Sequence, residues 1–326
     1  MKNIFITFDY ELFFGGNSGT AQKCIIEPVN KLREIANKYN VKFIFFVDSG
    51  YLVKLIEYKD KYEYVKKEYD LVFSNIQTLH KEGHDIQLHI HPHWEDSYFD
   101  GHKWTMDTKR YRLQDFNEKE IDDIVFRYKK VLTDIVVDKV FTYRAGGWCI
   151  QPFDKISKAL KKYNIWLDST TFYGGYNKSY THFYDFRKIP NKDIWKFEED
   201  IIYEDNKGFF TEIPISSIRL TPIFFWQFAF TKKFAKGKFK IYGDGKPVGA
   251  LKKDIFKMLT LPTYSCVSCD GYKSKLLQKS FNKFKGNNFV IIGHPKAQSE
   301  YSLNKLDEFV KNQKEYINTF KGKFNV

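Results

Sequence analysis

Cysteine and long apolar runs are both scarce in this chain. Its 326 residues include 4 cysteines, too few for a disulfide scaffold at this length, so a reducing environment is expected. No run of 18 apolar residues occurs, which excludes a membrane-spanning helix. Linkers rich in proline, glycine and serine are missing too, and no internal repeat is visible. A single domain over residues 1–326 is therefore the default expectation.

The start of the chain lacks the features of a secretion signal. Such a signal begins with basic residues, continues as an apolar stretch of about 7–15 residues and ends at a small-residue cleavage site. The first residues, MKNIFITFDYELFF, instead resemble a strand that ends in acidic side chains. We therefore expect a cytoplasmic protein.

Positive charge is concentrated in the last third of the chain. The net charge is +13, from 53 basic and 40 acidic residues. Residues 231–326 hold 20 lysines, no arginine and 7 acidic residues, which is +13, so residues 1–230 are neutral. This asymmetry fits a membrane surface or a phosphate-bearing substrate, with solvated surface lysines as the alternative. No nucleic-acid-binding motif accompanies the charge, so no nucleic-acid partner is expected.

Aromatic and branched residues are abundant, and they occur in alternating elements. The chain is 43% hydrophobic and 18% aromatic, which excludes a disordered chain. Apolar runs typical of strands occupy 3–10, 41–48, 84–91, 138–147, 165–170, 209–216 and 288–295. Segments with helical spacing occupy 27–39, 62–82, 117–136, 155–164, 274–284 and about 303–320. This alternation predicts an α/β fold whose parallel sheet is closed or nearly closed by outer helices, with an elaborated region near 172–260.

Polar side chains occur where the predicted strands end. They are Asp9, Glu11, His89, His91, His93, Arg144, Asp168 and His294. Parallel sheets in α/β proteins carry their functional groups at the carboxyl ends of the strands. We therefore expect all of these side chains on one rim of the sheet.

The segment HIHPHW holds three of the imidazoles within five residues. Imidazole and carboxylate groups together suit zinc or a neighbouring divalent metal, and a catalytic site keeps three protein ligands plus water. His89 and His93 can meet one ion if the backbone turns after the strand, and Pro92 favours that turn. A histidine cluster with ordinary hydrogen bonds is the alternative.

Two carboxylates stand near the same predicted rim. Asp9 and Glu11 are two residues apart on a strand and project to one side, whereas Tyr10 faces the other way. Near a metal, one carboxylate can bind the ion while the other takes a proton from water. A solvent-facing acid pair is the alternative.

Two further motifs offer an arginine and a fourth histidine. In YRAGGW, Arg144 precedes two glycines that permit a tight turn, and its guanidinium can hold a carboxylate in a fixed geometry. His294 ends the apolar strand of IGHPK and is a candidate proton donor. Asp168, on another strand end, is a candidate to orient that histidine and keep it charged.

Together these motifs resemble those of the polysaccharide deacetylase superfamily (NodB-like, carbohydrate esterase family 4). TFDYE (7–11), HIHPH (89–93), YRAGG (143–147), LDST (167–170) and IIGHP (291–295) occur in the family's order. The resemblance runs from residue 5 to about 300. It implies a distorted (β/α) barrel of about seven parallel strands that hydrolyses an N-acetyl group on a sugar with the help of a divalent metal, zinc being expected.

The resemblance also implies roles for individual residues. Asp9 corresponds to the general base and Arg144 to the residue that orients it. His294 corresponds to the general acid, tuned by Asp168.

For the metal, the resemblance implies His89 and His93 as ligands. The common family pattern has two adjacent aspartates, base then ligand, and the second position here is Tyr10. Some branches use an acid two residues on, which makes Glu11 the third ligand, with Asp9 as the alternative. If neither carboxylate reaches the ion, the protein is an inactive relative. His91 has no ligand role in this scheme and is a candidate for substrate contact.

The expected activity is therefore removal of an N-acetyl group from a sugar or glycan in assembly of a surface polysaccharide, with lipid-linked and nucleotide-linked sugars as candidate substrates. Hydrolysis of another C–N amide bond and non-catalytic glycan binding are the alternatives.

Trp94, Trp104 and Tyr111 are candidates for stacking on sugar rings, although core packing is commoner. Cys266 and Cys269 form a lone C-x-x-C pair with an expected structural role. The aromatic segment 223–240 leads into lysines and suits a weak peripheral membrane contact or, alternatively, a packed helix and a solvated turn.

Overall fold

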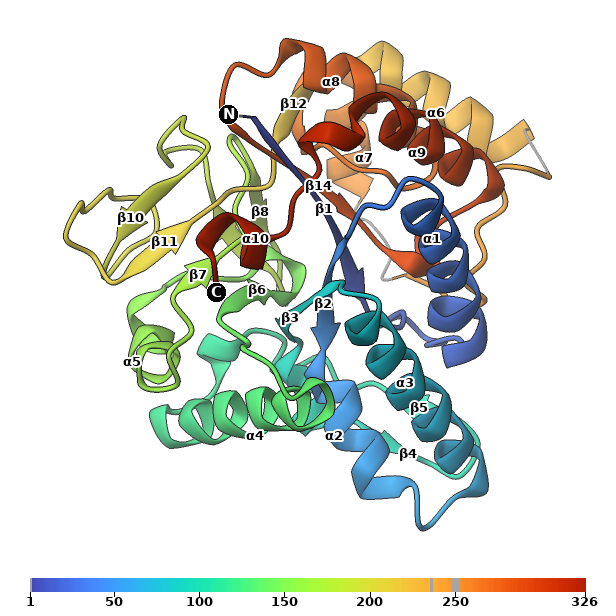
Figure 1. Cartoon of the computed structure of the whole chain (residues 1–326), viewed down its shortest axis with the longest axis vertical. Helices are drawn as coiled ribbons and strands as arrows, with labels where there is room; N and C mark the ends of the chain where they lie inside the picture. Colours follow the sequence, from blue (N-terminus) through green and yellow to red (C-terminus); the bar gives the residue numbers. More distant parts are fainter. Residues whose placement is uncertain (1, 235–236, 248–251) are drawn as a thin grey trace.

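The centre of the protein is a curled, open sheet of eight strands with helices outside it (Figure 1). A computed structural model describes residues 2–234, 237–247 and 252–326. The strand order is β10-β11-β7-β6-β3-β2-β1-β14. The bounds are β1 Asn3–Tyr10, β2 Ile44–Asp48, β3 Asp85–Ile90, β6 Thr142–Ala145, β7 Leu167–Asp168, β10 Trp195–Phe197, β11 Phe210–Glu212 and β14 Asn288–Gly293.

Neighbouring strands from β11 to β14 run parallel, and only β10 pairs antiparallel in this sheet. These seven parallel strands confirm the predicted α/β class and the distorted (β/α) barrel of about seven parallel strands, although the sheet is open and not closed or nearly closed. Strands β2, β3 and β14 are buried along their whole length. Burial on both faces explains the nearly continuous apolar runs of β2 and β14. In contrast, β3 alternates polar and apolar residues although all of them are buried.

The helices follow the strands as in a β/α barrel. Their bounds are α1 Glu27–Lys38, α2 Ser49–Tyr58, α3 Glu63–Lys81, α4 Glu118–Val136, α5 Asp154–Lys162, α8 Leu277–Lys283, α9 Glu300–Gln313 and α10 Phe320–Phe324. A capping box between Asn117 and Glu120 starts α4 where the sequence predicts it. The predicted helix at 303–320 is wrong at both ends, because Ser299 caps α9 earlier and the helix stops at Gln313.

Two stretches depart from the strand–helix alternation. The segment 92–116, between β3 and α4, contains β4 Tyr98–Phe99 paired with β5 Trp104–Thr105. Trp94, Trp104 and Tyr111 are buried; the two tryptophans belong to the hydrophobic core, and Tyr111 packs on His93. These three rings therefore pack inside the protein and are not presented for stacking on a sugar.

The elaborated region 172–260 adds small sheets and two helices, and its residues 235–236 and 248–251 lie outside the described residues. It holds the hairpin of β8 Tyr176–Lys178 and β9 Phe183–Asp185, as well as α6 Pro222–Phe234 and α7 Lys252–Thr260. In the same region β12 Ser217–Leu220 pairs with β13 Thr263–Cys266 from just beyond it. Across the described ranges, none of the helices is long and apolar enough to cross a bilayer.

Candidate active site

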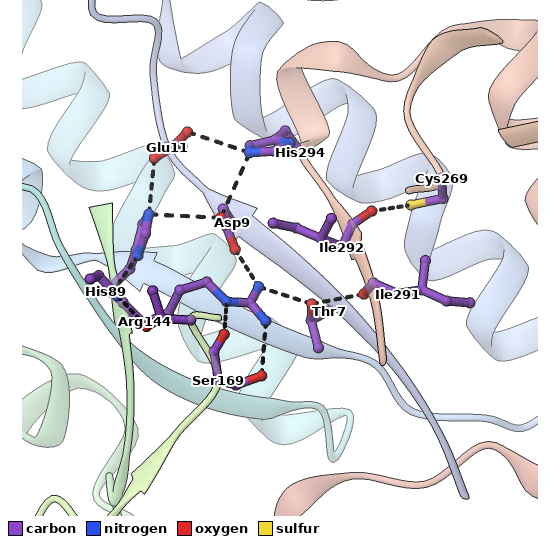
Figure 2. Close-up of polar contacts among 12 residues, drawn as sticks. Thr7, Asp9, Glu11, His89, Arg144, Ser169, Cys269, Ile291, Ile292 and His294 are labelled. Atoms are coloured by element: carbon purple, nitrogen blue, oxygen red, sulfur yellow. Dashed lines mark hydrogen bonds and ion pairs between the residues drawn. The ribbon is translucent and has the colours of Figure 1, made fainter. Parts of the chain in front are cut away.

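The polar rim predicted from the sequence is present at the carboxyl ends of β1, β3, β6 and β14. Figure 2 shows that the side chains at these strand ends face one another. Asp9 lies in β1, and Glu11 directly follows that strand. Facing them are His89 of β3, Arg144 of β6 and His294 after β14. Strand register brings His89 beside Arg144. All five side chains are largely or fully buried, so their charges interact in a medium that screens them weakly.

Glu11, His89 and His91 form a group whose donor atoms can hold one metal ion. Glu11 Oε2 lies 3.1 Å from His89 Nε2 and 2.6 Å from His91 Nε2. The two Nε2 atoms are 3.1 Å apart. Zinc ligands at about 2.0–2.2 Å in a tetrahedron stand about 3.3–3.6 Å from one another, so the three atoms need to separate only slightly around an ion.

The protonation of the two imidazoles also fits a metal. His89 Nδ1 donates to the Arg144 carbonyl oxygen at 2.8 Å, which directs Nε2 toward the group. Burial opposes a charge on His89, but the carboxylates of Asp9 and Glu11 outweigh it and raise its pKa. In the charged ring of His89, Nε2 also carries a proton, and this is the proton that a bound ion would displace. Burial lowers the pKa of His91 to about 4, so this ring is neutral, which is the metal-binding form.

The structure differs from the sequence prediction at His93, which lies outside this group. A 3-10 turn at Pro92–Glu95 follows β3 and directs the His93 ring against Tyr111, with the ring centres 5.2 Å apart and nearly parallel. Within the described ranges, neither ring nitrogen of His93 has a hydrogen-bond partner. His91 takes the position foreseen for His93, because residues i and i+2 of an extended chain project to the same side.

Gly146 provides the space that His91 occupies. A Cβ atom at this position would lie 2.5 Å from His91 Nδ1 and 2.6 Å from Cε1. Phe14 covers another side of the His91 ring, with ring centres 4.3 Å apart. The first glycine of YRAGG therefore sets the position of a histidine, which sequence reasoning assigned only to a tight turn.

Asp9 lies beside the metal-binding group and is held by Arg144. The Arg144 Nη1 donates to Asp9 Oδ1 at 2.6 Å, while its Nε donates to the Ser169 carbonyl oxygen at 2.7 Å (Figure 2). The other oxygen, Oδ2, is 3.9 Å from His89 Nε2 and 3.7 Å from His294 Nε2. Burial would raise the pKa of Asp9, but Arg144 and the two histidines lower it, so Asp9 is an ionised carboxylate with one oxygen facing the site.

Lys296 is a site residue that sequence reasoning missed. Its Nζ donates to Glu11 Oε1 at 2.8 Å and also to the Leu12 carbonyl oxygen, and the side chain is buried. Burial opposes ionisation of Glu11, yet Lys296 and His91 hold the pKa of that carboxyl well below its usual range. Glu11 thus offers Oε2 to the metal group while Oε1 is anchored. The available signal was a lysine directly after the GHP motif.

His294 is held by Asp270 and not by Asp168, which corrects the sequence prediction. Asp270 Oδ2 is 2.7 Å from His294 Nδ1, and Asp270 Oδ1 accepts the backbone N–H of His294 at 2.8 Å. Burial would lower the pKa of His294, but Asp270, with Asp9 and Glu11, raises it. The protonated Nε2 then points toward Asp9. Asp270 follows the C-x-x-C pair directly, in a segment outside the predicted strands that is joined to Ile292 of β14 by backbone hydrogen bonds.

Asp168 serves a different contact on the neighbouring strand. Its carboxylate accepts the N–H and the hydroxyl of Thr170 at 2.8 and 2.9 Å. It also lies against Glu212, and burial together with the charge of Asp168 raises the pKa of Glu212 well above its usual range. Asp168 therefore forms a buried carboxyl pair with Glu212, and the described residues show no contact between it and His294.

Comparison with known proteins places the fold. No family model matches the chain, and no curated protein matches it. A candidate polysaccharide deacetylase from Mycobacterium smegmatis is similar in structure, with 15% identity, a TM-score of 0.51, and coverage of 97% of this chain and 86% of that one. Polysaccharide deacetylase Bc1974 from Bacillus cereus (10% identity, TM-score 0.39, 96% and 89% covered) is also similar. So is BA3943, a CE4 family pseudoenzyme from Bacillus anthracis (12% identity, TM-score 0.40, 98% and 64% covered). The first likeness shows that the chain has the polysaccharide deacetylase fold.

Proposed function

We propose that this protein is a metal-dependent hydrolase that removes an N-acetyl group from a sugar, with zinc as the metal. The observation that carries the proposal is the convergence of three parts: the group of Glu11, His89 and His91, an ionised Asp9, and a charged His294. Two imidazoles and one carboxylate are a common ligand set of catalytic zinc sites. The fold and the order of the motifs support the same activity.

The side chains divide the work of amide hydrolysis. A divalent ion at the group would polarise the acetyl carbonyl and lower the pKa of water. Asp9, fixed through Oδ1 by Arg144, accepts the proton of the attacking water at its free Oδ2. His294, kept protonated by Asp270, donates a proton from Nε2 to the departing amine. The ordered presence of all these residues disfavours a non-catalytic glycan-binding relative.

The setting proposed for the reaction is cytoplasmic assembly of a surface polysaccharide. A nucleotide-linked or lipid-linked acetylated sugar carries phosphate groups, and the +13 net charge of residues 231–326 suits such a substrate. Hydrolysis of a different C–N amide bond by the same residues is the second reading, and it predicts release of a product other than acetate.

Acetate release from a panel of nucleotide-linked and lipid-linked N-acetyl sugars, with cyclic amides alongside, tests the activity. Asp9→Asn should keep its zinc and lose at least about 100-fold in turnover, because the general base is gone and the ligands remain. The matched control is Asp60→Asn, an exposed carboxylate on the surface, which should behave as the wild type. Loss of zinc in Asp9→Asn would make Asp9 a ligand, and retained turnover would remove it as the base.

A further inference from the structure

Helices α6 and α7 expose a group of large apolar side chains, which we name the α6–α7 face. It consists of Ile223 and Trp226 of α6 and Ile255 and Phe256 of α7, with exposed fractions of 68%, 59%, 42% and 69%. Residues 235 and 236 of the aromatic segment 223–240 lie outside the described residues. Figure 1 shows α6 at the outer edge of the molecule. An apolar surface of this kind marks a contact with a membrane or another molecule.

The opposite side of α6 is already packed. Phe224 and Phe225 are buried in a small cluster with Leu220, and Met258 and Leu259 pack against it. The α6–α7 face therefore cannot be buried against the protein's own core, because the inner side of α6 already packs there. A helix that is apolar all round is normally buried on all sides. The outer side of α6 is the part that still lacks such cover.

A basic cleft borders the same helix. Its volume is about 1010 Å³, and Ile223, Phe224 and Gln227 of α6 form part of its wall. Its cationic lining consists of Lys192, Arg219, Lys275, Lys279, Lys283 and Lys285. Its one acidic residue, Asp193, is used by the backbone N–H groups of Asn287 and Asn288, each at 2.6 Å. The cleft therefore presents a strong excess of positive charge.

Most of these cations form no ion pair within the part of the chain that the structure describes. Lys192 pairs with Glu204 at 2.6 Å. Arg219, Lys279 and Lys283 are exposed and make no ion pair with any residue that the structure describes. Unpaired cations next to exposed tryptophan and phenylalanine are the combination that suits the interface of an anionic bilayer.

The same region is joined to the catalytic rim. Tyr272 packs against Phe224 of α6, with ring centres 5.7 Å apart, and it stands two residues after Asp270, the partner of His294. The residue that α6 contacts, Tyr272, is therefore close in the chain to Asp270, which orients the proposed general acid.

We propose that the α6–α7 face and the adjoining basic cleft dock this protein on an anionic membrane surface. The apolar side chains enter the headgroup region, and the lysines and Arg219 contact lipid phosphates. An unidentified protein partner would need matching acidic groups, whereas a bilayer of anionic lipids supplies both the charge and the apolar layer. The inference does not depend on the proposed hydrolase activity.

Sedimentation of the full chain with vesicles tests the proposal. Binding is expected to vesicles of phosphatidylcholine with phosphatidylglycerol and not to phosphatidylcholine alone, and it should weaken as salt is raised. Inorganic phosphate at the concentration of the lipid headgroups should not release the protein. Failure to bind anionic vesicles at low salt, or full release by phosphate, would overturn the proposal.

Paired variants separate the apolar part from a general surface effect. Trp226→Ser with Phe256→Ser should weaken vesicle binding at least about tenfold, because two aromatic side chains are no longer buried in the bilayer. The matched control is Tyr98→Ser with Phe126→Ser, which are 49% and 44% exposed on β4 and α4, far from α6 in Figure 1. Equal binding by the two double variants would contradict docking through the α6–α7 face.

A second pair tests the charge. Lys279→Gln with Lys283→Gln should weaken binding about fivefold for each lysine removed. Lys119→Gln with Lys139→Gln removes the same charge from two exposed positions, one in the first turn of α4 and one three residues beyond its end, and should change binding much less. Zinc content and the circular dichroism spectrum of all variants should match the wild type. An equal loss in both pairs would show attraction by net charge alone and would overturn the role of the cleft.

Discussion

Replacing Gly146 with alanine perturbs the metal-binding group without changing any ligand. The added Cβ would stand 2.5 Å from His91 Nδ1, 2.6 Å from Cε1 and 2.8 Å from Cγ. Ordinary contacts between such atoms are about 3.5–4.0 Å, so the ring has to move by about 1 Å. Gly146 is not among the glycines with a positive φ, so the substitution brings no backbone strain.

The displacement of the His91 ring determines how much zinc affinity and how much unfolding free energy the variant should lose. Metal–ligand distances tolerate about ±0.2 Å, and loss of a positioning contact around a ligand typically costs about 10–100-fold in metal affinity. We expect Gly146→Ala to lose zinc affinity within that range, together with about 1–3 kcal/mol of unfolding free energy from overpacking. Competition titration with a chromogenic chelator gives the affinity, and urea unfolding gives the stability.

The control is Gly16→Ala, where an added Cβ meets nothing within 4 Å. It should match the wild type in zinc affinity and in stability. If Gly146→Ala binds zinc as tightly as Gly16→Ala while remaining folded, then His91 is not a ligand and the reasoning from the geometry fails.

Two other buried groups give separate tests. Burial lowers the pKa of His84 to about 4, so below pH 6.5 the unfolded chain binds a proton that the folded chain does not. The unfolding free energy should therefore fall by up to about 3 kcal/mol from pH 6.5 to 4. His84→Asn, which can still accept the Phe43 N–H, should flatten this slope in urea titrations; an unchanged slope contradicts the assignment. Asp270→Asn should lower the pKa of His294, followed by NMR, and cut turnover about 100-fold with zinc retained, whereas a larger effect of Asp168→Asn would contradict the pairing.

The sheet could be predicted from the sequence because its strands are buried on both faces. The stretches 4–8 and 289–293, within two of the predicted apolar runs, are apolar except for Thr7, and they pair directly as β1 and β14. The polar residues at the ends of these runs then mark the carboxyl edge of the sheet. Helix ends were less predictable, since α9 ends at Gln313 without a glycine or proline there and continues as a 3-10 turn over Lys314–Tyr316.

Within the site, local geometry predicted more than the family spacing did. The rule that residues two apart share one side of a strand placed Asp9 and Glu11 together, and the same rule selects His91 as the partner of His89. His93 was predicted as a metal ligand because it stands four residues after His89. That role requires the chain to turn so that the His93 ring faces the metal-binding group, and the turn that begins at Pro92 runs in a different direction.

Asp270 and Lys296 could not be assigned from the sequence. Asp270 comes from a segment outside the predicted strand ends, whereas Lys296 directly follows the predicted strand 288–295. The contact of each depends on how its segment packs. Asp270 reaches His294 because Cys269 and Ile292 are joined by a backbone hydrogen bond of 3.0 Å between their segments. Lys296 reaches Glu11 over 285 residues of sequence separation. Periodicity and motif order carry no information about such contacts.

The position of a bound metal tests the central claim most directly. Crystals of the zinc-loaded protein, measured at the zinc absorption edge, should show one anomalous peak about 2.0–2.2 Å from Glu11 Oε2, His89 Nε2 and His91 Nε2. Asp9 and His294 should flank the peak without binding it. A peak bonded to His93, or a zinc-saturated crystal with no peak at this rim, would contradict the account.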